Sequence, residues 1–206
     1  MAGFFVSFEG IDKCGKSTQA ALLTNHLKAI GYDVLLTREP GATVLGRELR
    51  HLLLTWNSPE SVSPKAEMLM FAADRAQHVA SLIRPALQAG KCVITDRFID
   101  STFAYQGYGR GLDTGQLKTI QNIATDGLVP HMTVWVDIEV KTSRSRMGLS
   151  ENDRIESESD EMFEKVRSGY AELHSAYPER IIRVDGEKTI QDVFQDILKA
   201  VMPRIS

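Results

Sequence analysis

The 206-residue chain carries 24 Lys and Arg against 27 Asp and Glu, a formal net charge of -3 that gives no basic excess for binding nucleic acid. Hydrophobic residues make up 43% of the chain and charged residues 25%, as in soluble globular proteins, and no apolar run could span a membrane. There is no signal-peptide pattern, and Cys14 and Cys92 match neither a disulfide framework nor a metal-binding spacing. We therefore expect one cytoplasmic domain over residues 1–206.

Apolar strand patterns alternate with helical patterns along the whole chain. This alternation predicts an α/β fold with a five-stranded parallel sheet flanked by helices. The predicted strands cover residues 4–8, 33–37, 91–96, 132–137 and 180–185. The predicted helices cover residues 17–31, 67–90, 112–127, 140–147, 154–174 and 189–201, and Pro85 should break or restart the second of them.

A phosphate-binding loop follows the first predicted strand. Gly10 to Ser17, GIDKCGKS, fits the pattern G-x-x-x-x-G-K-[ST] between a strand and a helix. The glycines let the backbone wrap around an anion, and the start of the helix points its N–H groups at that anion. Lys16 should reach the β- and γ-phosphates of a nucleotide, and the Ser17 hydroxyl should ligate Mg²⁺.

The loop alone is compatible with kinases, GTPases, transport ATPases and motors. The sequence contains no Asn-Lys-x-Asp, which argues against guanine recognition of the GTPase type. Arg38 and Arg97 follow the second and third predicted strands, so they meet the loop at one edge of a parallel sheet. These arginines could hold a second anion, which favours phosphoryl transfer over hydrolysis.

Four segments together resemble the thymidylate kinase family over nearly the whole chain: FEGIDKCGKST, TREPGATVLGRELR, FAADRAQH and TDRFIDSTFAYQGYGRG. A fifth, DRIESE, lies where that family has the end of its lid. The resemblance implies a doubly wound P-loop NTPase (nucleotide kinase) fold that moves the γ-phosphate of ATP to dTMP with Mg²⁺. It also implies a homodimer. Kinases for another (deoxy)nucleoside monophosphate and a slow nucleotide-hydrolysing switch remain the alternatives.

On the ATP side, the expected catalytic cations are Lys13, Lys16, Arg97 and Arg154. Arg154 resembles the lid-end arginine that approaches the ATP phosphates. Asp96 resembles a carboxylate near the Mg²⁺ water shell, and Ser17 is the other residue expected to bind Mg²⁺. Lys13 is expected to supply charge from the loop, because the lid, around residues 147–153, contains no arginine. Arg144 and Arg146 lie on the helix that precedes the lid. The expected ATP-binding residues are Gly10, Ile11, Asp12, Lys13, Cys14, Gly15, Lys16, Ser17, Thr18 and, over the adenine, Arg144.

On the acceptor side, Phe71 and Arg75 are four residues apart and share one helix face, where a ring and a guanidinium suit a pyrimidine. Periodicity alone favours Phe71 as a core residue and Arg75 as a solvated charge. The resemblance assigns them to stacking on thymine and to its O4. The full set expected to bind dTMP is Asp12, Arg38, Phe71, Arg75, Arg97, Thr102, Tyr105 and Gln106.

Overall fold

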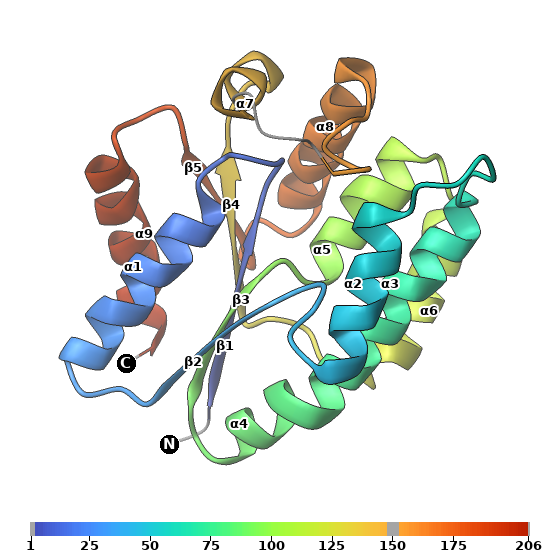
Figure 1. Cartoon of the computed structure of the whole chain (residues 1–206). Helices are drawn as coiled ribbons and strands as arrows, with labels where there is room; N and C mark the ends of the chain where they lie inside the picture. Colours follow the sequence, from blue (N-terminus) through green and yellow to red (C-terminus); the bar gives the residue numbers. More distant parts are fainter. Residues whose placement is uncertain (1–2, 148–152, 206) are drawn as a thin grey trace.

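The computed structural model describes residues 3–147 and 153–205, and its strands form one parallel sheet in the order β2-β3-β1-β4-β5 (Figure 1). The register aligns Phe8 of β1 and Arg38 of β2 with Asp96 of β3. The carboxyl ends of these strands therefore meet at one edge. The strands are β1 (Phe4–Glu9), β2 (Val34–Arg38), β3 (Cys92–Asp96), β4 (Met132–Asp137) and β5 (Ile181–Asp185).

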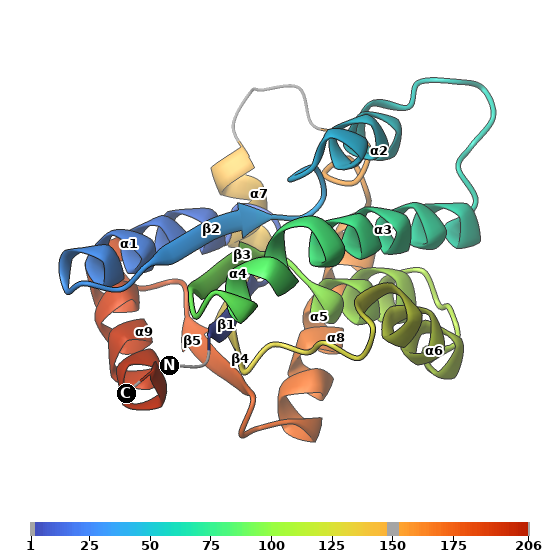
Figure 2. The same cartoon turned by 90° about the horizontal axis from the view of Figure 1, so that it is seen from below.

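Helices cover both faces of the sheet, as Figures 1 and 2 show. Helices α1 and α9 lie on one side, and α3, α4, α5, α6 and α8 on the other, with α2 packed on α3. The helices are α1 (Lys16–Ala29), α2 (Val44–Thr55), α3 (Pro64–His78), α4 (Arg84–Gln88), α5 (Ile99–Thr102), α6 (Thr114–Thr125), α7 (Val140–Met147), α8 (Asp160–Ala176) and α9 (Ile190–Ile205). Two π-helical turns, Val79–Ile83 and Phe103–Gly109, follow α3 and α5.

The structure contains all five predicted strands. They could be recognised because strands covered on both faces are continuously apolar. Every residue of β4 is buried, as are all but the first of β1. The expected interruption at Pro85 is also present: the helix that starts with α3 passes through a π-helical turn and resumes at Arg84.

Two helix predictions were wrong. Residues 44–55 lie outside the predicted helices but form α2, which Thr43 caps by accepting a hydrogen bond from the Gly46 N–H at 2.9 Å. The helix expected from Arg154 begins only at Asp160, where Ser159 caps the Met162 N–H. Before that point, Asp153 accepts the N–H groups of Ile155 and Glu156 at 2.8 Å, which stabilises turns instead of a helix.

Candidate active site

The loop from Gly10 to Ser17 joins β1 to α1 in a backbone conformation that requires glycine. Gly10 and Gly15 have φ of 140° and 98°, and a Cβ on Gly10 would lie 2.5 Å from the Val136 carbonyl oxygen. Ile11 and Cys14 are buried beneath the loop, and burial raises the pKa of the Cys14 thiol. The side chains of these two residues thus support the loop and leave its N–H groups to bind an anion.

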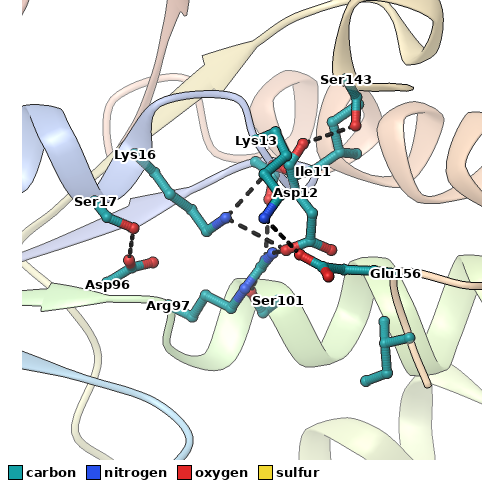
Figure 3. Close-up of polar contacts among 12 residues, drawn as sticks. Ile11, Asp12, Lys13, Lys16, Ser17, Asp96, Arg97, Ser101, Ser143 and Glu156 are labelled. Atoms are coloured by element: carbon teal, nitrogen blue, oxygen red, sulfur yellow. Dashed lines mark hydrogen bonds and ion pairs between the residues drawn. The ribbon is translucent and has the colours of Figure 1, made fainter. Parts of the chain in front are cut away.

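A cavity of about 450 Å³ opens over this loop. Lys16 approaches Asp12 Oδ1 to 3.6 Å, and the Ser143 hydroxyl supports the loop by donating to the Asp12 carbonyl at 2.7 Å (Figure 3). Cations from five segments of the chain converge on the cavity, as a polyphosphate would require. They are Lys13, Lys16, Arg38, Arg50, Arg97 and Arg146.

Two side chains with oxygen atoms that could bind a metal ion line this cavity. The Ser17 hydroxyl, at the start of α1, donates to Asp96 Oδ2 at the end of β3 (Figure 3). A hydroxyl and a carboxylate are hard oxygen donors, the kind that Mg²⁺ takes together with water and substrate phosphates. The residues present therefore fit the predicted Mg²⁺.

Two of the cations predicted for the ATP side, Lys13 and Arg154, occupy different places in the structure. Lys13 lies at the cavity, where its ammonium pairs with Glu156 at 3.0 Å. Arg154 does not reach the loop in this structure, since it donates to Glu67 at 2.7 Å and to the Leu53 carbonyl at 2.8 Å. Its approach to the ATP phosphates stays a prediction.

The arginine of α7 that lies beside the loop is Arg146, and not Arg144. Arg144 pairs with Asp160 at 2.6 Å and stacks 4.6 Å above the Phe163 ring, so it anchors the start of α8. Arg146 lines the cavity and its Nη1 lies 3.4 Å from the Lys13 carbonyl. The lid residues 148–152 lie outside the described residues.

A second cavity, of about 90 Å³, adjoins the first, and seven of the eight residues predicted for the acceptor line it. Arg38, the eighth, lines the phosphate cavity. The residues that line both cavities are Asp12, Glu39, Arg50, Arg97 and Asp153. The seven are Asp12, Phe71, Arg75, Arg97, Thr102, Tyr105 and Gln106.

Arg97 stands where the two cavities meet, in a left-handed conformation with φ of 72°. Its Nη2 donates to Asp12 at 2.7 Å and to the Tyr105 hydroxyl at 3.0 Å, and the Tyr105 hydroxyl in turn donates to Asp12 at 3.0 Å (Figure 3 shows Arg97 and Asp12). Burial opposes the charge of Asp12, but Arg97 and Lys16 hold its pKa well below the usual range. Asp12 is therefore an anion at neutral pH, and it orients Arg97.

Arg75 lines the acceptor cavity and is only 2% exposed. Its Nε donates to Glu39 at 2.8 Å, its Nη1 donates to Thr102 at 2.7 Å and also to Gln121, and its Nη2 donates to the Phe98 carbonyl at 2.9 Å. A buried guanidinium with this many fixed partners is held rigidly. Arg75 is thus a core-anchored side chain, and not a solvated charge.

Sequence reasoning missed Arg50, Glu39, Gln121 and Glu67. Arg50 lies in a segment that carries the family resemblance, but no role was predicted for it. Burial, followed by the nearby charge of Arg38, lowers the pKa of Arg50. Two guanidinium groups held this close favour an anion between them.

Glu9 is a fully buried carboxyl group at the end of β1. It accepts hydrogen bonds from the Phe98 N–H at 2.8 Å, the Ser101 hydroxyl at 2.5 Å and the Tyr170 hydroxyl at 2.9 Å. Burial, with a contribution from Asp100, raises the pKa of Glu9 to about 7 despite the opposing charge of Arg97. Glu9 therefore holds a proton in the folded chain at pH values where the unfolded chain has lost it.

This raised pKa predicts that Glu9→Gln changes the pH dependence of stability. Between the ordinary pKa near 4.5 and about 7, the folded state binds the extra proton, so Glu9 makes stability fall as pH rises. Over this window the free energy of unfolding of the wild type should fall by about 3 kcal/mol relative to the variant. Denaturant unfolding of both proteins from acidic to neutral pH measures this difference. Parallel profiles would contradict the assignment.

The fold and the two joined cavities define a nucleotide-binding phosphotransferase of the phosphate-binding-loop class. A model of the thymidylate kinase family matches residues 8–197, so the chain belongs to the thymidylate kinase family, as its motifs indicate. Its activity is the phosphorylation of dTMP to dTDP.

Individual relatives are similar to this chain over nearly their full length. The chain is 47% identical over 201 residues to thymidylate kinase of Caldanaerobacter subterraneus subsp. tengcongensis, covering 98% of this chain and 96% of that protein. It is 45% identical over 206 residues to thymidylate kinase of a Nostoc species, covering 96% of each. The crystal structure of thymidylate kinase from Ehrlichia chaffeensis superposes with a TM-score of 0.80 at 32% identity, covering 98% of this chain and 99% of that one. Within the described ranges, no helix has the length and apolar character needed to cross a membrane.

Proposed function

We propose that the phosphate cavity binds ATP, the adjoining cavity binds dTMP, and the γ-phosphoryl group passes between them beside Arg97. The observation that carries this proposal is that Arg97 and Asp12 line both cavities. A phosphate oxygen of dTMP attacks the γ-phosphorus while the bond to the ADP oxygen breaks. The attacking oxygen is already anionic at neutral pH, so the protein needs to supply charge and alignment and no strong base.

The cations act on the charge of the two substrates. Lys16 neutralises the β- and γ-phosphates, and Arg97, with Arg50 and Arg38, holds the two phosphate groups in contact against their mutual repulsion. Lys13 and Arg146, which line the same cavity as Lys16, would add positive charge beside the ATP phosphates. Mg²⁺, held by Ser17 and Asp96, would supply further charge neutralisation when bound.

The acceptor cavity fits a thymine nucleotide. Phe71 offers a ring to stack on the base, and Arg75 donates a hydrogen bond to thymine O4, where cytosine has an amino group. Tyr105 and Asp12, which line the same cavity, would contact the sugar. An acceptor with a donor opposite Arg75 would leave two buried donors opposed, which costs more than a missing methyl group.

An acceptor series tests this assignment. ADP release in the presence of ATP and Mg²⁺ should be fast with dTMP and about fourfold slower with dUMP, because the thymine methyl contributes about 0.8 kcal/mol. The ribose analogue of dTMP should be a poor acceptor, and dCMP and AMP should be negligible. Faster turnover of dCMP or AMP would favour another nucleoside monophosphate kinase, and release indifferent to every acceptor would favour a hydrolase or switch.

Ser17→Ala should raise the Mg²⁺ concentration needed for half-maximal activity. The substitution removes one of the two oxygen ligands while leaving the loop backbone intact, and lost metal contacts of this kind weaken affinity roughly 10–100-fold. Titrating activity with Mg²⁺ at fixed ATP measures the shift, with Thr119→Ala on α6, which lines neither cavity, as the control. An unchanged Mg²⁺ requirement would remove Ser17 from the metal site.

We further propose a homodimer in a reducing cytoplasm. Helix α3 packs against both α2 and α6, and these three helices expose Leu52 (40%), Leu69 (54%) and Ile123 (75%). Apolar side chains exposed on adjacent helices fit a symmetric interface. Both cysteines are unpaired and buried, as a reducing compartment favours. Light scattering should give about twice the 22.9 kDa mass of one chain.

A further inference from the structure

Glu67 stands behind the wall of the acceptor cavity, in the first turn of α3, and is 1% exposed. Its Oε1 accepts a hydrogen bond from Gln106 Nε2 at 2.9 Å. Its Oε2 accepts from Arg110 at 3.0 Å and from Arg154 at 2.7 Å. Gln106 lines the acceptor cavity, and its hydrogen bond to Glu67 connects Glu67 to this cavity.

Glu67 is ionised in this environment. Burial alone would raise its pKa, but the hydrogen bonds from Arg110, Gln106 and Arg154 together hold the pKa below its ordinary value. An ionised carboxylate can only accept hydrogen bonds. The amide of Gln106 must therefore turn its NH₂ toward Glu67.

The other end of the same amide is then fixed as well. With Nε2 bound to Glu67, the carbonyl Oε1 of Gln106 is left for a ligand in the cavity, and within residues 3–147 and 153–205 no group donates to it. Gln106 therefore presents a hydrogen-bond acceptor to the cavity.

Arg75 presents the complementary group. A guanidinium has five N–H groups. In Arg75 four of them donate to Glu39, Thr102, Gln121 and the Phe98 carbonyl. In the described part of the chain, one N–H on Nη2 remains for a ligand. The cavity thus combines one donor, from Arg75, with one acceptor, from Gln106.

This pair matches the edge of thymine or uracil, where O4 accepts and N3–H donates. Cytosine reverses both groups, with a donating amino group and an accepting N3. If the Gln106 amide could rotate, its NH₂ would meet the N3 of cytosine and half of the discrimination would disappear. The group that prevents this rotation therefore contributes to base selection.

We propose that Glu67 is a specificity-determining positioning residue, which fixes the Gln106 amide so that its carbonyl accepts a hydrogen bond from N3–H of the base. The inference rests on the proposed binding of dTMP in this cavity. Arg110 and Arg154 support Glu67 by keeping its carboxylate in place.

Glu67→Gln tests the inference, because a glutamine at this position can donate as well as accept and so lets the Gln106 amide turn over. The ratio of kcat/KM for dTMP to kcat/KM for dCMP should fall by about tenfold or more, as expected when a buried donor gains or loses its partner. Glu67→Asp keeps an acceptor-only carboxylate. Its ratio should stay near that of the wild type even if both rates fall.

The exchange variant Glu67→Gln/Gln106→Glu provides the rescue. Its glutamine donates to the carboxylate now at position 106, whose second oxygen faces the cavity as an acceptor, so the preference for dTMP should return. A loss of stability alone would lower both activities and leave the ratio unchanged. Should E67Q not fold, the exchange variant still decides, since a wild-type ratio supports the inference and a preference for dCMP overturns it.

The outcomes also separate this inference from the function on which it rests. A wild type that is selective for dTMP, together with an equally selective E67Q, overturns the role of Glu67 and leaves the acceptor site standing. A wild type that does not phosphorylate dTMP overturns both.

Discussion

Replacing Lys16 by methionine is expected to lower kcat for dTMP phosphorylation by about a thousandfold, because one well-placed charge or donor at a transition state contributes on this scale. Lys16 is only 7% exposed, and its ammonium lies inside the phosphate loop near Asp12. Methionine keeps the length of the side chain and removes its charge. The loss should therefore appear in kcat without a loss of the folded state.

Steady-state kinetics with saturating dTMP measures this effect. Lys28→Met is the matched control, since Lys28 lies in the last turn of the same helix and is exposed to solvent. The control should retain wild-type activity. A Lys16→Met enzyme with more than about a tenth of wild-type kcat would show that Lys16 does not carry the transferring charge.

Arg97→Met should lower kcat/KM for dTMP by about a thousandfold, because a guanidinium that holds the transferring phosphate groups stabilises the transition state on the scale of an oxyanion-hole donor. The substitution leaves the Asp12 carboxylate without its 2.7 Å partner and takes one cation from the boundary of the two cavities. The protein should also unfold at a lower temperature, since the half-buried Asp12 carboxylate remains charged without its partner.

Two further measurements isolate the role of Arg97 in the acceptor site. Arg97→Lys keeps the charge but loses the planar fork, so its kcat/KM should fall between wild type and Arg97→Met. The affinity for an ATP analogue should change much less than the affinity for dTMP in both variants. Equal losses of both affinities would instead indicate that the substitution damages the fold.

The sheet and the phosphate loop could be predicted because their signals are local. A strand that is buried on both faces is a continuous apolar run, and the loop has a fixed spacing of glycines and lysine. Helix α2 was missed because its sequence, VLGRELRHLLLT, contains a glycine and lies between two loops. Its stability comes from packing on α3, a contact that periodicity does not reveal.

The outer parts of the site depend on contacts between distant segments. Arg144 and Arg146 are two positions apart on a short helix, so they point to different sides, and only the packing of α7 decides which one meets the loop. Glu67 resembles an ordinary acidic residue in the first turn of a helix. Its burial results from Gln106, Arg110 and Arg154, which lie far along the chain.

Direct phosphoryl transfer requires ATP and dTMP to be bound side by side. The most direct test measures ADP and dTDP in the same reaction, with and without dTMP. The two products should form in equal amounts, and ADP release without an acceptor should be a small fraction of that rate. ADP formation at the same rate in the absence of dTMP, with no matching dTDP, would mean that the second cavity does not serve as the acceptor site.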